Sequence, residues 1–379
     1  MSRARLTSFI SALLLAGSCA APAVAKDSTI RQLYVFSCSS GGTCPNGEAP
    51  AALLLSSDGN FYGVTGNGGT GSNAAGTVFK LTSDFQLTTL HTFQSGNSSD
   101  GAFPTGLVEG SDGNLYGTTV AGGANDNGAL FRLSKSGDFR LLHSLCASCG
   151  EGSDPEFLVK GSDGNFYGDS YGVLFQVTPD GKFTVLHTFD SATEGPDALG
   201  LVQASNGDFY GTTLGARTVL TSFFRLKPTG QFSILQTFHY ARFPTTPPIQ
   251  AADGRLYGIL TIDAGHNAPG LFRSNLSAGK FADLSLQTNS RDLPKYLMQA
   301  SDGTLWGEVF TGIDYPNGTL FGYSTKGKLL QQIVLDGSNG SNPSAPLIQA
   351  PDGTLIGIAY SGGTAANGDT AAGTVFAIQ

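Results

Sequence analysis

The chain has 379 residues, of which 53 are Gly and 13% are charged, and its net charge is -8. This Gly content argues against a helical protein, because Gly inside a helix costs about 1 kcal/mol relative to Ala, and the lack of Gly at every third position excludes collagen. The acidic balance and the absence of Lys/Arg runs argue against a nucleic-acid partner, which leaves a turn-rich, all-β protein.

The first 25 residues have the three-part pattern of a secretory signal peptide. Arg3 and Arg5 give a basic start, residues 6–16 are apolar, and residues 23–25 read Ala-Val-Ala, a small-x-small cleavage site. We therefore expect residues 1–25 to be removed as a signal peptide during export.

The mature chain, residues 26–379, is then expected to be one secreted or periplasmic domain. No later segment has 18 consecutive apolar residues, so no transmembrane segment is expected. The alternative is a lipoprotein signal, in which Cys19 would carry the lipid anchor.

Four cysteines follow the leader: Cys38, Cys44, Cys146 and Cys149. An even number of cysteines in an exported protein favours disulfides, and the short spacings favour two local bridges, Cys38 with Cys44 and Cys146 with Cys149. The C-x-x-C spacing of the second pair also occurs in zinc and redox sites, but neither a second ligand pair nor a βαβ context accompanies it.

A six-residue string recurs seven times at intervals of 43 to 54 residues, and it sets the organisation of the chain. In each copy an apolar run precedes a tight turn, typically Asp-Gly, and a second strand follows the turn. After a Gly- and Asn-rich loop comes a third strand with the signature Gly-x-x-Phe, from which copy four departs with Ser222-Phe223-Phe224. The copies start at Asp58, Asp112, Asp163, Asn206, Asp253, Asp302 and Asp352.

A second turn and a fourth strand, best seen at residues 183–189, complete each copy. Four short antiparallel strands per repeat of about 50 residues are typical of a propeller blade, so we predict an all-β, seven-bladed β-propeller. The last copy stops after its third strand at Gln379, whereas residues 29–36 resemble a fourth strand without a preceding repeat. The N-terminal strand is therefore predicted to complete the last blade and close the ring.

Three recurring strings resemble the tandem GloVer repeat of exported bacterial choice-of-anchor proteins. They are Asp-Gly-x-(Leu/Phe)-Tyr-Gly, Gly-Thr-Val-Phe at Gly76 and Gly373, and Leu-His-Thr-Phe at Leu90 and Leu186. The resemblance covers essentially the whole mature chain, and it implies an exported β-propeller without implying a particular activity.

Residues repeated in every blade are interpreted as structural. The motif Asp side chains are expected to bond the local backbone of their turns, and the motif Tyr side chains are expected to fill the space between blades. The fourth-strand residues His91, His143 and His187 are expected to be packing or rim residues.

Departures from the repeat are the better functional candidates. Asp169 and Glu308 are charged at a second-strand register that is apolar or hydroxylated in the other blades. Glu109 and Lys160 interrupt a first-strand register otherwise rich in Gln, and a pairing of these two across adjacent blades is one explanation.

Blades four to six also concentrate polar and aromatic residues on their predicted loops, a composition suited to a sugar or uronic acid. The main prediction is an exported protein that binds carbohydrate or a protein partner, and the alternative is a polysaccharide lyase or glycoside hydrolase. The candidate catalytic residues are His266, Glu308 and Asp169, and the candidate ligand-binding residues are Tyr240, Arg242, Arg291, Tyr296, Asp314 and Tyr315. No metal or cofactor motif is found, and a monomer is expected.

Overall fold

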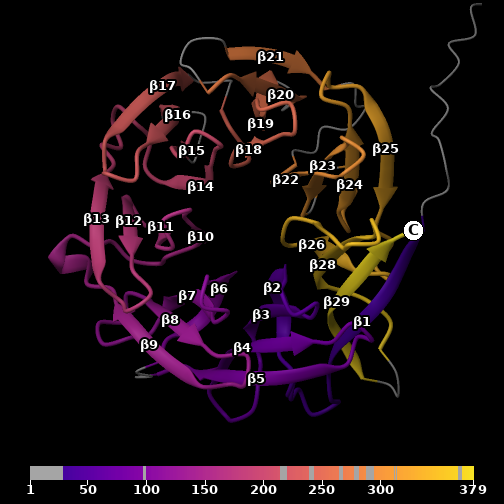
Figure 1. Ribbon diagram of the computed structural model, residues 1–379. Coiled ribbons are helices and arrows are strands. Elements are labelled where there is room, and N and C mark those ends of the chain that lie inside the picture. Colours follow the sequence, from indigo (N-terminus) through magenta and orange to yellow (C-terminus); the bar gives the residue numbers. More distant parts are fainter. Residues whose placement is uncertain are drawn as a thin grey trace, which may run out of the picture.

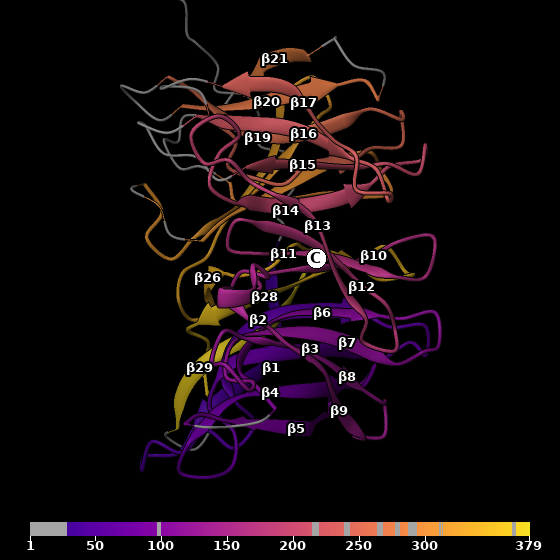
Figure 2. The same cartoon turned by 90° about the vertical axis from the view of Figure 1, so that its left-hand side faces the viewer.

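The computed structural model describes residues 29–96, 100–213, 220–238, 243–263, 268–276, 281–286, 294–310, 312, 314–365 and 369–379. Seven antiparallel sheets stand around a central channel, with the first strand of each sheet nearest the centre and the last at the circumference (Figure 1). Seen on edge, the strands cross the disc from one face to the other (Figure 2). The prediction of a seven-bladed β-propeller with four strands per blade is confirmed.

The first four blades each consist of four strands in chain order. They are β2 (Glu48–Leu55), β3 (Phe61–Asn67), β4 (Ala74–Leu81) and β5 (Leu87–Gln94); β6 (Ala102–Glu109), β7 (Leu115–Ala121), β8 (Ala129–Leu133) and β9 (Phe139–Ser144); β10 (Leu158–Lys160), β11 (Phe166–Ser170), β12 (Val173–Val177) and β13 (Phe183–Thr188); and β14 (Ala198–Gln203), β15 (Phe209–Thr213), β16 (Thr221–Leu226) and β17 (Phe232–Phe238).

The last three blades follow the same plan, except that the inner strand of blade seven is split into two short pieces. Their strands are β18 (Ile249–Gln250), β19 (Leu256–Asp263), β20 (Ala268–Ser274) and β21 (Phe281–Ser285); β22 (Tyr296–Gln299), β23 (Leu305–Val309), β24 (Thr319–Tyr323) and β25 (Leu329–Val334); and β26 (Ser341–Pro343), β27 (Ile348–Gln349), β28 (Leu355–Ser361), β29 (Thr370–Ile378) and β1 (Ile30–Cys38).

The two ends of the chain meet in blade seven. Strand β1 pairs antiparallel with β29, from Ile30 opposite Ile378 to Cys38 opposite Thr370. In Figure 1 the indigo β1 lies outside the yellow β29, in the position that a fourth strand takes in the other blades. The predicted ring closure is confirmed, and it pairs two strands that would otherwise be open sheet edges.

The repeated Asp serves both its turn and its blade. In blade one, the Asp58 Oδ1 atom accepts the Asn60 backbone N–H at 3.1 Å, and its Oδ2 atom accepts the hydroxyl of the buried Tyr62 at 2.9 Å. Blades two, three and five repeat both bonds. The structural interpretation of the motif Asp and Tyr therefore fits the observed contacts, and the motif spacing reflects one shared hydrogen-bond pattern.

The last Gly of the motif and the Phe of Gly-x-x-Phe are two halves of one packing contact. A Cβ atom on Gly117 would lie 2.3 Å from the Phe131 ring and 2.6 Å from the Gly106 carbonyl oxygen. Since the ring covers the Gly, any side chain there would displace either the ring or the inner strand. The same Gly and Phe contact recurs in blades one, three, four, five and seven.

Neighbouring blades are also joined by hydrogen bonds at the end of the inner strand. The Gln250 side-chain oxygen accepts the Ser205 backbone N–H of the preceding blade at 2.8 Å, and Gln203, Gln299 and Gln349 do the same at their junctions. Glu109 takes this role in blade two. We call this contact, from the side chain at the end of one inner strand to the backbone N–H of the preceding blade's turn, the junction clamp. Glu109 is bonded to Ser57 and to Lys135 rather than to Lys160.

The fourth-strand histidines pack between blades. The His187 ring stacks on Phe232 of the next blade, with centroids 3.7 Å apart, and its Nε2 atom lies 2.8 Å from a Glu194 carboxylate oxygen. His91 and His143 make equivalent contacts in blades one and two. These contacts agree with the packing role expected from the sequence.

Two disulfides are present, Cys38 with Cys44 and Cys146 with Cys149, as predicted. Each lies in the connection from an outermost strand to the next inner strand, and the second closes a 3-10 turn at Ala147–Cys149. In the described part of the chain, no helix is long and apolar enough to cross a membrane.

Candidate functional site

The two faces of the disc carry different connections. Because the strands of each blade are antiparallel, the Asp-Gly turns lie on one face, which we call the turn face. The connections between strands two and three, and those between blades, lie on the other, which we call the loop face.

The inner strands of blades one, two and four each have a bulge near their start, at the loop face. In blade two the register shifts between Pro104 and Gly106, so Thr105 is the extra residue that faces the channel. The residues at the same register in the seven blades, which we call the bulge residues, are Ala51, Thr105, Glu156, Leu199, Thr245, Lys295 and Ser344.

Hydroxyl groups at this register link adjacent blades. The hydroxyls of Thr105, Thr245 and Ser344 donate to the carbonyl oxygens of Pro155, Pro294 and Pro50 in the next blade, at 3.1, 3.0 and 2.6 Å. Glu156 in blade three and Lys295 in blade six are the two charged residues of the ring. They therefore place opposite charges at one opening.

The mouth is a cavity of about 350 Å³ that contains both charged bulge residues. This volume is within the range of small-ligand sites. Aromatic and hydroxyl groups from blades two, six and seven complete its wall. The lining residues are Ala51, Thr105, Val120, Glu156, Lys295, Tyr296, Phe310, Ser344 and Tyr360.

The aromatic side of the mouth is built by blades six and seven. Phe310 follows β23, Tyr360 lies near the end of β28, and their rings meet edge to face with centroids 5.7 Å apart. The Lys295 Nζ atom lies 5.5 Å from the Phe310 ring centroid, which is a cation–π contact. Tyr360 is 41% exposed, so its ring remains available to a ligand.

The acidic side of the mouth is built by blades three and four. Glu156 is exposed to water in the channel. Even so, desolvation by the surrounding protein atoms, followed by the nearby carboxylates of Asp197 and Asp154, raises its pKa. Asp169 is fully buried behind it, and burial followed by Asp197 and Glu156 raises the pKa of Asp169 well above its ordinary value. The carboxyl groups on this side of the mouth therefore keep their protons to a higher pH than isolated Asp or Glu side chains do.

Glu308 stands behind the aromatic side. Its carboxyl is 1% exposed, and burial raises its pKa well above the ordinary value, while the Leu347 N–H partly offsets this rise. It pairs across the sheet with Tyr296, which lines the mouth. Burial, followed by the charges of Glu308 and Glu156, raises the pKa of Tyr296 to about 12, so this hydroxyl keeps its proton at neutral pH.

The predicted site residues are thus only partly gathered. Tyr296 lines the mouth, whereas the side chains of Asp169 and Glu308 are buried in the walls of different blades and do not reach solvent. Tyr315 packs against the core of blade six, and Asp314 beside it is exposed. The remaining candidates, His266, Tyr240, Arg242 and Arg291, lie outside the described residues.

Reasoning from the sequence missed Glu156, Phe310 and Tyr360 as site residues. A usable signal was present, because Pro immediately precedes the bulge residue in six blades: Pro50, Pro104, Pro155, Pro244, Pro294 and Pro343. Aligning the chain on that Pro would have placed Glu156 and Lys295 at one register. Phe310 and Tyr360 carry no comparable mark, because they meet only where the two blades converge.

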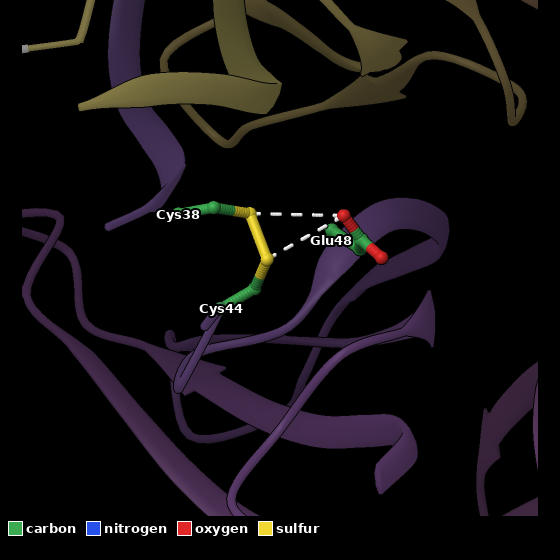
Figure 3. Close-up of side chains that lie close together, drawn as sticks. All are labelled: Cys38, Cys44 and Glu48. Carbon is green, nitrogen blue, oxygen red and sulfur yellow. Dashed lines mark hydrogen bonds between the residues drawn. A yellow bond between two sulfur atoms is a disulfide. The ribbon is translucent and has the colours of Figure 1, made fainter. Parts of the chain in front are cut away.

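One group of potential metal-ligating atoms is found among the described residues, at Cys38, Cys44 and Glu48 (Figure 3). One Glu48 carboxylate oxygen lies 3.6 Å from the Cys38 sulfur and 3.5 Å from the Cys44 sulfur. The two sulfurs are joined in a disulfide, so they offer no thiolate to a metal and no S–H to the carboxylate. This group is therefore a packing contact at the first disulfide.

The fold and the mouth together define a seven-bladed β-propeller with a polar and aromatic candidate ligand site on its loop face. The family model of the Gloeobacter/Verrucomicrobia repeat matches residues 23–171. This match agrees with the resemblance that the recurring strings indicated, over the first part of the chain. No curated protein sequence matches it.

Solved structures share the architecture at low sequence identity. Virginiamycin B lyase from Staphylococcus aureus has a TM-score of 0.64 and 12% identity, over 93% of this chain and all of that chain. The extracellular domain of BT4673 from B. thetaiotaomicron has a TM-score of 0.57 and 11% identity, over 92% of this chain and 42% of that chain. A gluconolactonase from Xanthomonas campestris, XC5397, has a TM-score of 0.48 and 14% identity, over 93% and 89% of the two chains. At such identities the likeness to the lyase and to the BT4673 domain shows the fold alone.

Proposed function

We propose that this chain is an exported carbohydrate-binding propeller that holds its ligand at the channel mouth of the loop face. The observation that carries the proposal is the arrangement of the mouth, in which the Phe310 and Tyr360 rings stand beside Lys295 and face a wall containing Glu156. Aromatic faces stack on sugar rings, and charged or hydroxyl groups bond sugar hydroxyls. The two disulfides and the secretory leader pattern support export.

The charges of the mouth favour particular sugars. Lys295 is exposed and can pair with the carboxylate of a uronic acid. Glu156, on the acidic side, can accept hydrogen bonds from sugar hydroxyls. We therefore expect acidic oligosaccharides to bind more tightly than neutral ones of the same length.

The test is isothermal titration calorimetry of the mature chain against a panel of neutral and uronic-acid oligosaccharides. Tyr360→Ala is expected to weaken binding about tenfold, because it removes an exposed ring from the mouth. The matched control is Tyr171→Ala, which removes a 67% exposed ring that does not line the mouth. Equal losses in both variants, or no saturable binding to any glycan, would refute the proposal.

A second candidate function is a polysaccharide lyase or glycoside hydrolase at the same mouth. It is favoured by the proximity of Glu156, whose pKa is raised, and Tyr296, whose hydroxyl stays protonated at neutral pH, since a carboxyl with a raised pKa suits general acid catalysis. In this alternative Glu156 is the proton donor, and the buried Asp169 and Glu308 act through Glu156 and Tyr296.

The enzyme alternative is tested by incubating the mature chain with polysaccharides and measuring new reducing ends and the absorbance of unsaturated products. Glu156→Gln is expected to abolish either signal while leaving glycan binding measurable. Binding without any product from the wild-type chain would exclude the enzyme for the substrates tried and retain the binding function.

A further inference from the structure

Among the described residues, the junction clamp forms at five junctions. Lys160 stands in place of the acceptor between blades two and three, and the junction between blade seven and blade one, on the turn face, lacks both partners. Leu55 pairs with Phe61 in the register at which Gln203 pairs with Phe209, so Leu55 occupies the position of the clamp acceptor. Across from it, Pro351 precedes Asp352 where the other turns have a residue with a backbone N–H, which is donated to the clamp at five junctions. Pro has no N–H and Leu has no acceptor, so both halves of the junction clamp are missing here.

A cavity of about 570 Å³ lies at this junction, on the face opposite to the channel mouth. Leu55 and Pro351 both line it, so the opening occurs where the clamp is lost. The other walls are largely apolar side chains from β1, blade one and blade seven. The lining includes Arg31, Leu33, Leu55, Phe61, Phe85 and Ile356.

The rim of the cavity carries one guanidinium and one carboxylate. Arg31 is exposed, and its side chain has no hydrogen bond or ion pair with any of the described residues. Asp352, at the turn side, is engaged by its own turn, because its Oδ1 atom accepts the Thr354 N–H at 2.9 Å. A ligand anion is therefore expected at the β1 side of the cavity, next to Arg31.

We propose that this cavity binds the free, monomeric form of a carboxylate with an apolar chain, such as a medium-chain fatty acid. The chain lies against Leu33, Leu55 and Phe85, and the carboxylate pairs with Arg31. The volume is within the range of small-ligand sites. The site shares no lining residue with the channel mouth, so it is independent of the proposed carbohydrate function.

The test restores the missing clamp. The double variant Leu55→Gln, Pro351→Ala supplies the acceptor and the N–H found at other junctions, and it is expected to fill the opening. Calorimetric titration with decanoate below its micelle concentration should show saturable binding to the wild-type chain and at least tenfold weaker binding to this variant. Its melting temperature should equal or exceed that of the wild-type chain, which confirms folding.

Two further variants separate the parts of the proposal. Arg31→Gln should weaken decanoate binding at least fivefold and leave decanol binding unchanged. Gln250→Leu removes the clamp at the junction of blades four and five, and should leave decanoate binding unchanged.

Three outcomes would overturn the proposal: undiminished decanoate binding by the folded double variant, no saturable binding by the wild-type chain, or binding only to phospholipid vesicles. Retained glycan binding in the same samples would separate failure of this site from failure of the channel mouth.

Discussion

Replacing Glu109 by Gln should isolate the charge of one junction clamp. One Glu109 oxygen accepts the Ser57 N–H at 2.8 Å and the Ser56 hydroxyl at 3.0 Å, and the other accepts the Ser57 hydroxyl at 2.6 Å and the Lys135 ammonium at 2.7 Å. Four other junctions have Gln at this register, and each of these accepts the same backbone N–H. Glu109→Gln should therefore keep the clamp and lose the ion pair.

The magnitude follows from the pKa of Glu109. Burial raises it, but the hydrogen bonds from Lys135, Ser57 and Ser56 outweigh burial and lower it from 4.5 to about 2. That difference corresponds to about 3 kcal/mol. Glu109 and Lys135 are 16% and 24% exposed at the rim of the turn face, where water and salt screen charges, so we expect about 1–2 kcal/mol.

The pH dependence of the difference in unfolding free energy between Glu109→Gln and wild type tests whether charge is responsible. A carboxyl whose pKa is lower in the folded state stabilises the fold above its unfolded pKa, and this stabilisation is lost as the pH falls from 4.5 to about 2. Urea unfolding followed by circular dichroism should show the full difference between Glu109→Gln and wild type at pH 7, and almost none near pH 2. A difference that is independent of pH would mean that shape rather than charge is responsible.

Three other substitutions test the remaining contacts. Asp169→Asn should stabilise the chain by about 1–3 kcal/mol at pH 7. Because folding raises the Asp169 pKa, the free energy of unfolding of the wild-type chain falls as the pH rises above 3.8. A difference in unfolding free energy between variant and wild type that does not grow with pH in urea titrations would contradict this. Gly117→Ala should cost about 1–3 kcal/mol in urea unfolding, because the new Cβ meets the Phe131 ring, and a neutral result would show that the ring can move. His187→Leu should lower the melting temperature, whereas an unchanged value in calorimetry would mean that the stack on Phe232 contributes little.

Much of the fold could be predicted because each blade repeats the same short-range contacts. The bonds between Asp58 and its partners Asn60 and Tyr62 span two and four residues, so the six-residue motif contains both partners of each bond. The disulfides span six and three residues and were predicted for the same reason. Ring closure was also accessible, because a missing strand at one end and a surplus strand at the other can be counted.

The candidate site was less accessible, because it is assembled between blades. The sequence marked Asp169 and Glu308 as unusual, and the structure shows both as buried residues behind the channel wall. Glu156 and Tyr296, which line the channel, lie 140 residues apart in the chain and meet at one mouth only after the ring closes. A repeat alignment can reveal which register is unusual, but it does not reveal which registers face the channel.

The sequence by itself therefore determined the number of blades, their internal hydrogen bonds, the two disulfides and the closing strand, because local spacing and counting specify them. The tertiary structure alone decided which side chains share the channel mouth. It also decided that the junction of Leu55 with Pro351 opens into a cavity. Both features arise where blades from distant parts of the chain converge, and the geometry of a closed ring sets those distances.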